Sequence, residues 1–261
     1  MNTSLLGKNA VVCGSTQGIG KATAIEMANL GASVTLVARS EPKLLSTLEE
    51  LPKAAGQVHG YLAVDFSNPE YLNSKITQLA DEIEVHILVN NTGGPAPGLA
   101  IEAAPTAFLE AFQQHLICNQ YLVKALVNGM KQAQYGRIVN VISTSVKAPI
   151  AGLGVSNTIR GAVASWAKTL ARELGPFGIT VNNVLPGLTS TQRLENLIHK
   201  RAEDAGISAE EQERLMKQNV PAKRFATPEE VAAAICFLSG PSAAYINGIN
   251  LPVDGGNTPT L

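Results

Sequence analysis

The stretch NAVVCGSTQGIG, residues 9–20, joins an apolar run to a turn that contains three glycines. The apolar run predicts a buried strand, and residues 21–31 after the turn predict a helix. In such a unit Gly14 permits a sharp turn, Gly18 lets the backbone approach a bound anion closely, and Gly20 lets the helix pack on the strand. The free N–H groups at the start of the helix then face the anion. The stretch therefore predicts nucleotide binding; the alternative is that the three glycines only form a turn.

The rest of the chain repeats this alternation of short apolar runs and helical stretches. Further strands are predicted at residues 33–38, 57–65, 86–91, 137–143, 178–187 and 248–256. Further helices are predicted at residues 42–51, 69–82, 105–133, 155–174 and 228–240. Continuous apolar strands that alternate with helices are typical of a parallel sheet covered on both faces. We expect one Rossmann-type, doubly wound α/β domain over residues 1–261, with about seven strands, and a polar helical insert at 190–219 that acts as a substrate lid.

The composition narrows the classes of function. Of 261 residues, 45% are hydrophobic and 16% are charged, and the net charge is −1. A chain so close to neutrality offers no electrostatic basis for binding nucleic acid or an anionic membrane. No apolar run approaches the roughly 18 residues that span a bilayer, and the N-terminus lacks a secretory signal, so a cytoplasmic protein is expected. The three cysteines, Cys13, Cys118 and Cys236, form no CxxC pair, and no metal site is predicted.

The end of the predicted second strand bears on the choice of cofactor. An acidic side chain there would hold the ribose 2′-hydroxyl of NAD, whereas this chain has Arg39 followed by Ser40. A planar cation suits a 2′-phosphate, so NADP(H) is expected in preference to NAD(H); the alternative is a surface arginine. Asp65, at the end of the third strand, would accept a hydrogen bond from the adenine amino group or cap the next helix near Asn68.

Six motifs along the chain carry a family resemblance. They are GSTQGIG (14–20), Asp65, NNTGG (90–94), Ser143, Pro186-Gly187 and the tail at 226–256. Together they resemble the short-chain dehydrogenases/reductases of the β-ketoacyl-ACP reductase-like type, over nearly the whole chain. Thr92 replaces the small Ala of the family's usual NNAG. The resemblance implies hydride transfer between a nicotinamide cofactor and a carbonyl or alcohol, with a small molecule or an acyl thioester as substrate.

The resemblance also implies a catalytic tetrad, from which this chain departs. In the family a Tyr acts as acid and base, a Lys four residues later lowers the pKa of that Tyr, a Ser orients the carbonyl, and an Asn supports a proton relay. Mapped by spacing, Ser143 is retained, and Ser156 and Arg160 stand where the Tyr and the Lys are expected. His115 falls near the Asn position. The chain thus resembles a divergent subgroup without the Tyr-x-x-x-Lys pair.

The changed tetrad leaves three interpretations open. In the first, the protein is a reductase in which Arg160 stabilises the developing alkoxide, Ser143 and Ser156 hydrogen-bond the carbonyl or a water, and His115 delivers the proton. In the second, it binds NADP(H) without hydride transfer and serves as a sensor or partner protein. In the third, the substrate brings its own acid. The residues also have structural alternatives: a helix N-cap for Ser156, a surface salt bridge for Arg160 and a subunit contact for His115.

The predicted cofactor contacts lie at the strand ends and in the loops that follow them. They are Gly14, Ser15, Thr16, Gly18, Ile19, Gly20, Arg39, Ser40, Asp65, Phe66, Asn91, Gly93, Arg160, Pro186, Gly187 and Thr191. Thr191 is expected to place its hydroxyl near the nicotinamide carboxamide. In the family the helices at 105–133 and 155–174 form a four-helix contact, which implies a homodimer or a homotetramer.

Overall fold

The computed structural model describes residues 1–54 and 56–260, and in them the predicted alternation of strands and helices is confirmed. The elements are β1 (Asn9–Cys13), α1 (Gly18–Asn29), β2 (Ser33–Ala38), α2 (Glu41–Glu49), β3 (Gly60–Ala63), α3 (Pro69–Glu82), β4 (Ile87–Asn90), α4 (Pro105–Phe112), η1 (Gln113–Ile117), α5 (Cys118–Gln132), β5 (Gly136–Val141), η2 (Thr144–Val146), α6 (Gly154–Leu174), η3 (Gly175–Phe177), β6 (Ile179–Pro186), α7 (Gln192–Ala205), α8 (Ala209–Asn219), α9 (Pro228–Ser239), η4 (Pro241–Ala243) and β7 (Asn250–Val253).

The strands form one parallel, seven-stranded sheet in the order β3-β2-β1-β4-β5-β6-β7. The chain starts in the middle of the sheet, and the order reverses between β1 and β4, where Ala10 pairs with Ile87. At such a switch point the loops after the two strands diverge to opposite faces and leave a crevice at the carboxyl ends of the strands. The doubly wound, Rossmann-type fold is therefore confirmed, and it places the glycine turn after β1 at that crevice.

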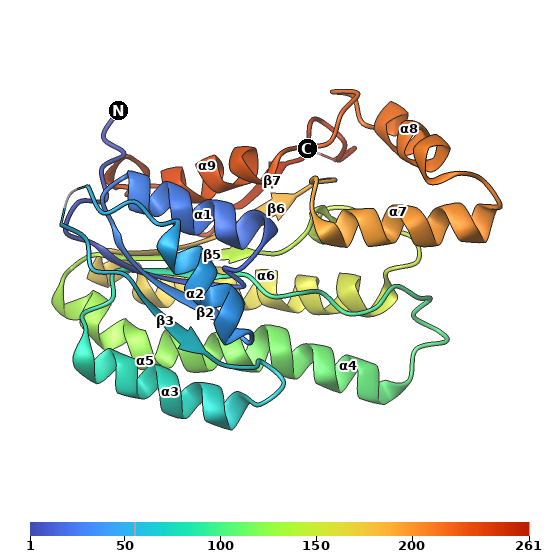
Figure 1. Ribbon diagram of the computed structural model, residues 1–261. Helices are drawn as coiled ribbons and strands as arrows, with labels where there is room; N and C mark the ends of the chain where they lie inside the picture. Colours follow the sequence, from blue (N-terminus) through green and yellow to red (C-terminus); the bar gives the residue numbers. More distant parts are fainter. Residues whose placement is uncertain (55, 261) are drawn as a thin grey trace.

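The residues of β1 alternate between the two faces of the sheet. Ala10 and Val12 pack in one core together with Met27 of α1. Val11 and Cys13 pack in a second core on the opposite face. Figure 1 shows α1, α2 and α9 on one side of the sheet and α3, α5 and α6 on the other. Because both faces are covered, the strands read as continuous apolar runs.

The insert consists of two helices, α7 and α8, with a break between them. Gly206 ends α7 in the left-handed conformation (φ +66°), and the hydroxyl of Ser208 caps α8 by accepting from the Glu211 N–H. The insert is not only a polar surface, because it has a small core of its own that includes Leu194, Ile198, Met216 and Phe225. In Figure 1 the two helices stand beyond the carboxyl ends of the strands, over the crevice.

The helix predicted at 105–133 contains a turn of π-helix, η1, between α4 and α5. A π turn holds one residue more than an α turn, and such turns occur frequently at functional sites. It carries His115, whose side chain is buried.

Four asparagines form a chain of side-chain hydrogen bonds across the sheet from β4 to β7. Asn90 Nδ2 donates to Asn140 Oδ1 at 2.8 Å, and Asn140 Nδ2 donates to Asn183 Oδ1 at 2.9 Å. Asn183 Nδ2 then donates to Asn250 Oδ1 at 2.8 Å. The four residues are register partners on neighbouring strands. Among the described residues no group bonds to the buried Asn90 Oδ1 at the head of this ladder.

Within residues 1–54 and 56–260, none of the helices has the length and apolar character that a membrane span requires.

Candidate active site

A cavity of about 670 Å³ opens at the carboxyl ends of the strands. The glycine turn, the ends of β2 and β3, the loops after β4 and β5, the start of α6 and the insert form its walls. The predicted residues in its lining are Gly14, Thr16, Gly18, Ile19, Arg39, Asp65, Phe66, Asn91, Gly93, Ser143, Ser156, Arg160, Pro186, Gly187 and Thr191. Positions spread over most of the sequence therefore meet in one cavity.

Close contacts fix the shape of the glycine turn. Gly14 has φ +61°, and a Cβ there would lie 2.5 Å from the Asn91 carbonyl oxygen; a Cβ on Gly20 would lie 2.1 Å from the Gly14 carbonyl oxygen. The Asn91 Nδ2 donates to the Cys13 carbonyl at 3.2 Å and so ties the turn to the loop after β4. α1 begins at Gly18, its first turn has no acidic residue, and no described side chain caps it. The amino end of α1 is therefore open to an anion in the cavity.

Arg39 and Asp65 line the cavity at the ends of β2 and β3. Asp65 Oδ1 accepts from the Ser67 N–H at 2.9 Å, and this bond, with a smaller effect of the Arg39 charge, lowers the pKa of Asp65. The N-cap of α3 is Asn68, whose Oδ1 accepts from the Tyr71 N–H at 3.1 Å. The capping alternative for Asp65 is therefore wrong, and its carboxylate stays at the cavity wall.

Three predicted cofactor residues lie outside the lining of the cavity. Ser15 is fully buried, and its Oγ donates to the Val37 carbonyl at 3.4 Å. Gly20 packs under Gly14, and Ser40 is the N-cap residue of α2. These residues shape the turn and the helix starts, and direct contact with a cofactor stays a prediction for them.

Ser156 and Arg160 lie one helical turn apart on α6, and both line the cavity. Leu153 is the N-cap of α6, so the N-cap alternative for Ser156 is wrong. Arg160 is 8% exposed, and none of the ion pairs among the described residues includes it, so the surface-salt-bridge alternative is also wrong. Its Nη1 donates to the Val141 carbonyl at 3.1 Å and its Nη2 to the Thr92 carbonyl at 3.5 Å.

The wall that carries Arg160 combines a cation with two hydroxyls. Burial, together with the charge of Arg193, lowers the pKa of Arg160 to about 10, so its guanidinium stays protonated at neutral pH. Ser143 follows β5, and its Oγ accepts from the Ser145 N–H at 3.1 Å. A hydroxyl that accepts in this way keeps its own hydrogen to donate. Ser143 and Ser156 can thus donate to an oxygen in the cavity while Arg160 supplies positive charge.

His115 lies behind the cavity wall. Its side chain is 1% exposed, and its Nδ1 lies 2.5 Å from Oγ1 of Thr92, which lines the cavity. Burial, with the charges of Arg160 and Arg193, lowers the pKa of His115 to about 3, so the ring is neutral at physiological pH. A proton from His115 would have to pass through the Thr92 hydroxyl. The subunit-contact alternative is wrong, because the ring is buried within one chain.

The segment after β6 closes the cavity on the side of the insert. The Gly187 N–H donates to the Val253 carbonyl at 3.0 Å, and a Cβ on Gly187 would lie 2.7 Å from Cα of Asp254. Thr191 is the N-cap of α7, where its Oγ1 accepts from the Leu194 N–H at 3.4 Å and donates to a backbone carbonyl. Its contact with a nicotinamide carboxamide stays a prediction.

Sequence reasoning missed several polar residues of the cavity, among them Gln114, Arg193 and Asn257. Arg193 is the second residue of α7, two positions after the capping Thr191. A threonine followed by a helical segment signals the start of a helix and so places Arg193 in its first turn. The sequence gives no comparable signal for Gln114 or Asn257.

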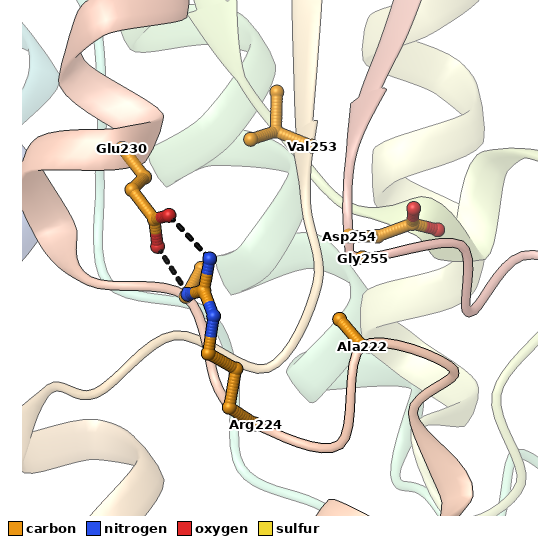
Figure 2. A pocket seen from close by; sticks show the side chains of 7 residues that line it. Ala222, Arg224, Glu230, Val253, Asp254 and Gly255 are labelled. Carbon is orange, nitrogen blue, oxygen red and sulfur yellow. Dashed lines mark hydrogen bonds and ion pairs between the residues drawn. The ribbon is translucent and has the colours of Figure 1, made fainter.

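A second, smaller hollow of about 100 Å³ lies where the insert rejoins the sheet. Figure 2 shows Arg224 and Glu230 paired through two hydrogen bonds at its wall, with Asp254 on the far side. Glu230 also accepts from the Thr227 N–H at 2.9 Å in the capping box of α9. The bonds from Arg224 and then from Thr227 lower the pKa of Glu230 to about 2. The pair of Arg224 and Glu230 thus ties the end of the insert to the start of α9.

Fold, glycine turn and cavity together define a dinucleotide-binding oxidoreductase of the short-chain type. The family model described as enoyl-(acyl carrier protein) reductase matches residues 14–258. The chain belongs to the short-chain dehydrogenase/reductase family.

Known members of similar length resemble this chain from end to end. The 3-oxoacyl-[acyl-carrier-protein] reductase FabG of Vibrio cholerae serotype O1 is 34% identical over 254 residues, which cover 97% of this chain and 98% of that protein. L-sorbose reductase from Gluconobacter frateurii, solved with NADPH and L-sorbose, is 31% identical with a TM-score of 0.93 over 100% of both chains. YwfH, an NADPH-dependent reductase involved in bacilysin biosynthesis, is 27% identical with a TM-score of 0.92 over 97% of this chain and 99% of that chain. The family resemblance is therefore confirmed.

Proposed function

We propose that this protein transfers a hydride between NADP(H) and a carbonyl or alcohol substrate. The observation that carries the proposal is one continuous cavity, which joins the open amino end of α1 to Ser143, Ser156 and Arg160. One structural relative was solved with NADPH and another is an NADPH-dependent reductase, and both support the cofactor. Arg39 at the end of β2 supports the phosphorylated form, because a planar cation suits a 2′-phosphate.

The residues of the cavity fit this cofactor along its length. Gly18 and the first N–H groups of α1 would take the pyrophosphate, Arg39 the 2′-phosphate and Asp65 the adenine amino group. When bound, the cofactor would supply or accept the hydride. Thr191 begins α7 beside the glycine turn, since a Cβ on Gly18 would lie 3.0 Å from Thr191 Cγ2. That position supports a contact between the Thr191 hydroxyl and the nicotinamide end.

Ser143, Ser156 and Arg160 would act on the substrate oxygen. The two hydroxyls would orient it by hydrogen bonds, and Arg160 would stabilise the negative charge that develops there. Neither a serine hydroxyl nor a guanidinium gives up its proton readily near neutral pH. The proton would therefore come from water that these hydroxyls hold, with Thr92 and the neutral His115 as a hydrogen-bonded pair next to it.

The test is calorimetry with NADPH, followed by NADPH absorbance with a panel of sugars, small ketones and acyl thioesters. We expect binding and turnover, and we expect Arg160→Met to lower kcat about 100-fold, as for loss of one group that stabilises an oxyanion. Lys168→Met is the matched control, because Lys168 lies on α6 but bonds to the Gly248 carbonyl away from the cavity. No heat with NADPH would contradict the proposal.

A second outcome would identify a silent binding protein. If the wild type binds NADPH but turns over no substrate, and Ser156→Tyr combined with Arg160→Lys restores activity, the chain has lost hydride transfer. Wild-type turnover above that of the double variant favours the reductase.

The insert and the outer helices support two further proposals. The insert 190–219 would act as a lid on a single catalytic domain, because Thr191 and Leu194 at its start line the cavity. A cytoplasmic homodimer or homotetramer would bury apolar side chains of α4 such as Leu109, which is 68% exposed, and Phe112, which is 38% exposed. Light scattering after size exclusion would measure the assembly, and Leu109→Glu should weaken it.

A further inference from the structure

Arg193 reaches from the insert across the cavity to the loop after β4. Its Nη1 donates to the Gly94 carbonyl at 2.9 Å and its Nη2 to the Pro95 carbonyl at 3.3 Å. The guanidinium lies directly against Gly94, since a Cβ at that position would be 2.7 Å from Nη2. A guanidinium has five N–H donors, so these two bonds leave three of them for a ligand. Arg193 is thus held at the exposed rim of the cavity with donors to spare.

Positive charge at this end of the cavity has no carboxylate partner in the lining. Arg160 is buried in the wall, Arg193 lies at the rim, and the charge of each acts on His115 behind Thr92. Among the described lining residues Asp65 is the only carboxylate, and it lies in the loop after β3, the strand at the edge of the sheet. The ion pairs of the described residues include neither arginine. Arg160 is buried without a counter-charge, which is costly, and an anion bound at this end of the cavity would offset that cost. Arg193 at the rim has free donors that can hold such an anion.

The neighbouring lining residues limit what kind of anion fits. Ile150, Leu153 and Leu197 add apolar side chains to the lining of the same cavity, and Gln114 adds a polar one. Under the proposed function the phosphates of the cofactor bind at α1 and Arg39, so they do not account for Arg193. A guanidinium binds a planar carboxylate through two parallel hydrogen bonds.

We infer that the substrate is a carboxylate-bearing carbonyl compound, an oxo acid or the matching hydroxy acid, whose carboxylate binds Arg193. The inference rests on the proposed function and names the class of substrate. Ser143, Ser156 and Arg160 take the carbonyl oxygen, and the apolar residues take the carbon chain between the two groups. Arg193 is a specificity-determining residue.

The test compares acids with their methyl esters, which keep the carbonyl and remove the charge. Levulinate is measured beside methyl levulinate by NADPH oxidation. A charge-assisted hydrogen bond is worth roughly tenfold to hundredfold, so we expect kcat/KM for the acids to exceed that for the esters by about 30-fold. Arg193→Gln should abolish this preference by raising KM for the acids, Arg193→Lys should restore part of it, and neither should change the affinity for NADPH. Arg201→Gln, on the same helix but outside the lining, is the matched control.

A binding readout separates failure of this inference from failure of the proposed function. Calorimetry of hexanoate against hexanamide, with NADP⁺ present, needs no turnover. If no carbonyl is reduced but hexanoate binds more tightly and loses that advantage in Arg193→Gln, the reductase proposal fails and the anion site stands. If the wild type is active and has equal kcat/KM values for acids and esters, the anion site is overturned and the reductase proposal stands. Loss of NADPH affinity in Arg193→Gln would also overturn it, because Arg193 would then serve the cofactor.

Discussion

The two ends of the cavity are built in different ways. At the proposed cofactor end, the turn from Gly14 to Gly20 would meet the ligand through backbone groups, and close contacts leave no room for a side chain at Gly14 or Gly20. The substrate end combines side chains from separate loops and helices, such as Ser143, Arg160 and Arg193. A site made of backbone tolerates little change, whereas a site made of side chains can change its chemistry while the fold stays intact. This difference is consistent with the proposal that Ser156 and Arg160 replace the expected Tyr and Lys in a site whose glycine turn fits a cofactor.

One added methyl group tests whether the close contacts of the glycine turn are needed for NADPH binding. In Gly20→Ala the new Cβ would lie 2.1 Å from the Gly14 carbonyl oxygen, so the turn has to move. We expect NADPH affinity, measured by calorimetry, to fall about 100-fold. Gly129→Ala on α5 is the control, because its nearest contact at 3.8 Å is ordinary and the helix should gain about 0.5–1 kcal/mol. Normal NADPH binding by Gly20→Ala would show that the turn is not the phosphate site.

The burial of His115 predicts that the free energy of unfolding depends on pH. Because the pKa of His115 is lowered to about 3, the unfolded chain takes up a proton below pH 6.5 while the folded chain does not, so this contribution to stability is lost as the pH falls. At pH 5 the loss relative to pH 7 is about 2 kcal/mol. In urea unfolding, His115→Asn should therefore lose about 2 kcal/mol less than the wild type between these pH values. The exposed His199→Asn is the control, and parallel profiles for His115→Asn and wild type would contradict the burial of His115.

At the proposed cofactor end, Arg39 is the residue that we expect to discriminate between the two pyridine nucleotides. Arg39→Asp should lower the ratio of kcat/KM with NADPH to that with NADH about tenfold, because an acid repels the 2′-phosphate and accepts from a 2′-hydroxyl. Lys43→Asp on α2 tests whether any loss of positive charge nearby has the same effect. An unchanged ratio in Arg39→Asp would place the 2′-phosphate elsewhere.

The smallest effect is expected in the insert. Ser208→Ala removes the N-cap of α8 and should destabilise that helix by about 1 kcal/mol. Hydrogen exchange over residues 209–219 should become faster and KM for the carbonyl substrate should rise, while NADPH affinity stays the same. Ser208→Asp keeps a capping oxygen and should behave like the wild type. A matching loss of NADPH affinity would mean that the two ends of the cavity are coupled.

The fold was predictable because its signals are local. A glycine turn between an apolar run and a helix, repeated alternation and continuous apolar strands each follow from short stretches of sequence. The third strand shows the limit of such signals. It was expected at 57–65 but spans Gly60–Ala63, because it lies at the edge of the sheet and its pairing with β2 stops at Ala38.

The site was predictable only where spacing from a fixed element decides the position. Ser156 and Arg160 follow Ser143 along the chain at a known distance, and the structure brings all three to the cavity. Arg193 could not be found in this way, because a polar, solvent-facing helix does not show which of its charged residues turns inward. The contact of His115 with Thr92 depends on a π turn, for which the sequence carries no signal.

The side-chain hydrogen bonds of the asparagine ladder all run in one direction across the sheet, from β4 to β7. Each amide Nδ2 donates a hydrogen bond to Oδ1 of the next asparagine, in the same direction from Asn90 to Asn250. Reversing one amide would therefore set two N–H groups or two oxygens against each other. A strand that slipped by one residue would carry its amide to the opposite face and break the series. Four side chains outside the cavity lining thus help to set how far β4 to β7 extend relative to one another, and with that the positions of the strand ends that border the cavity.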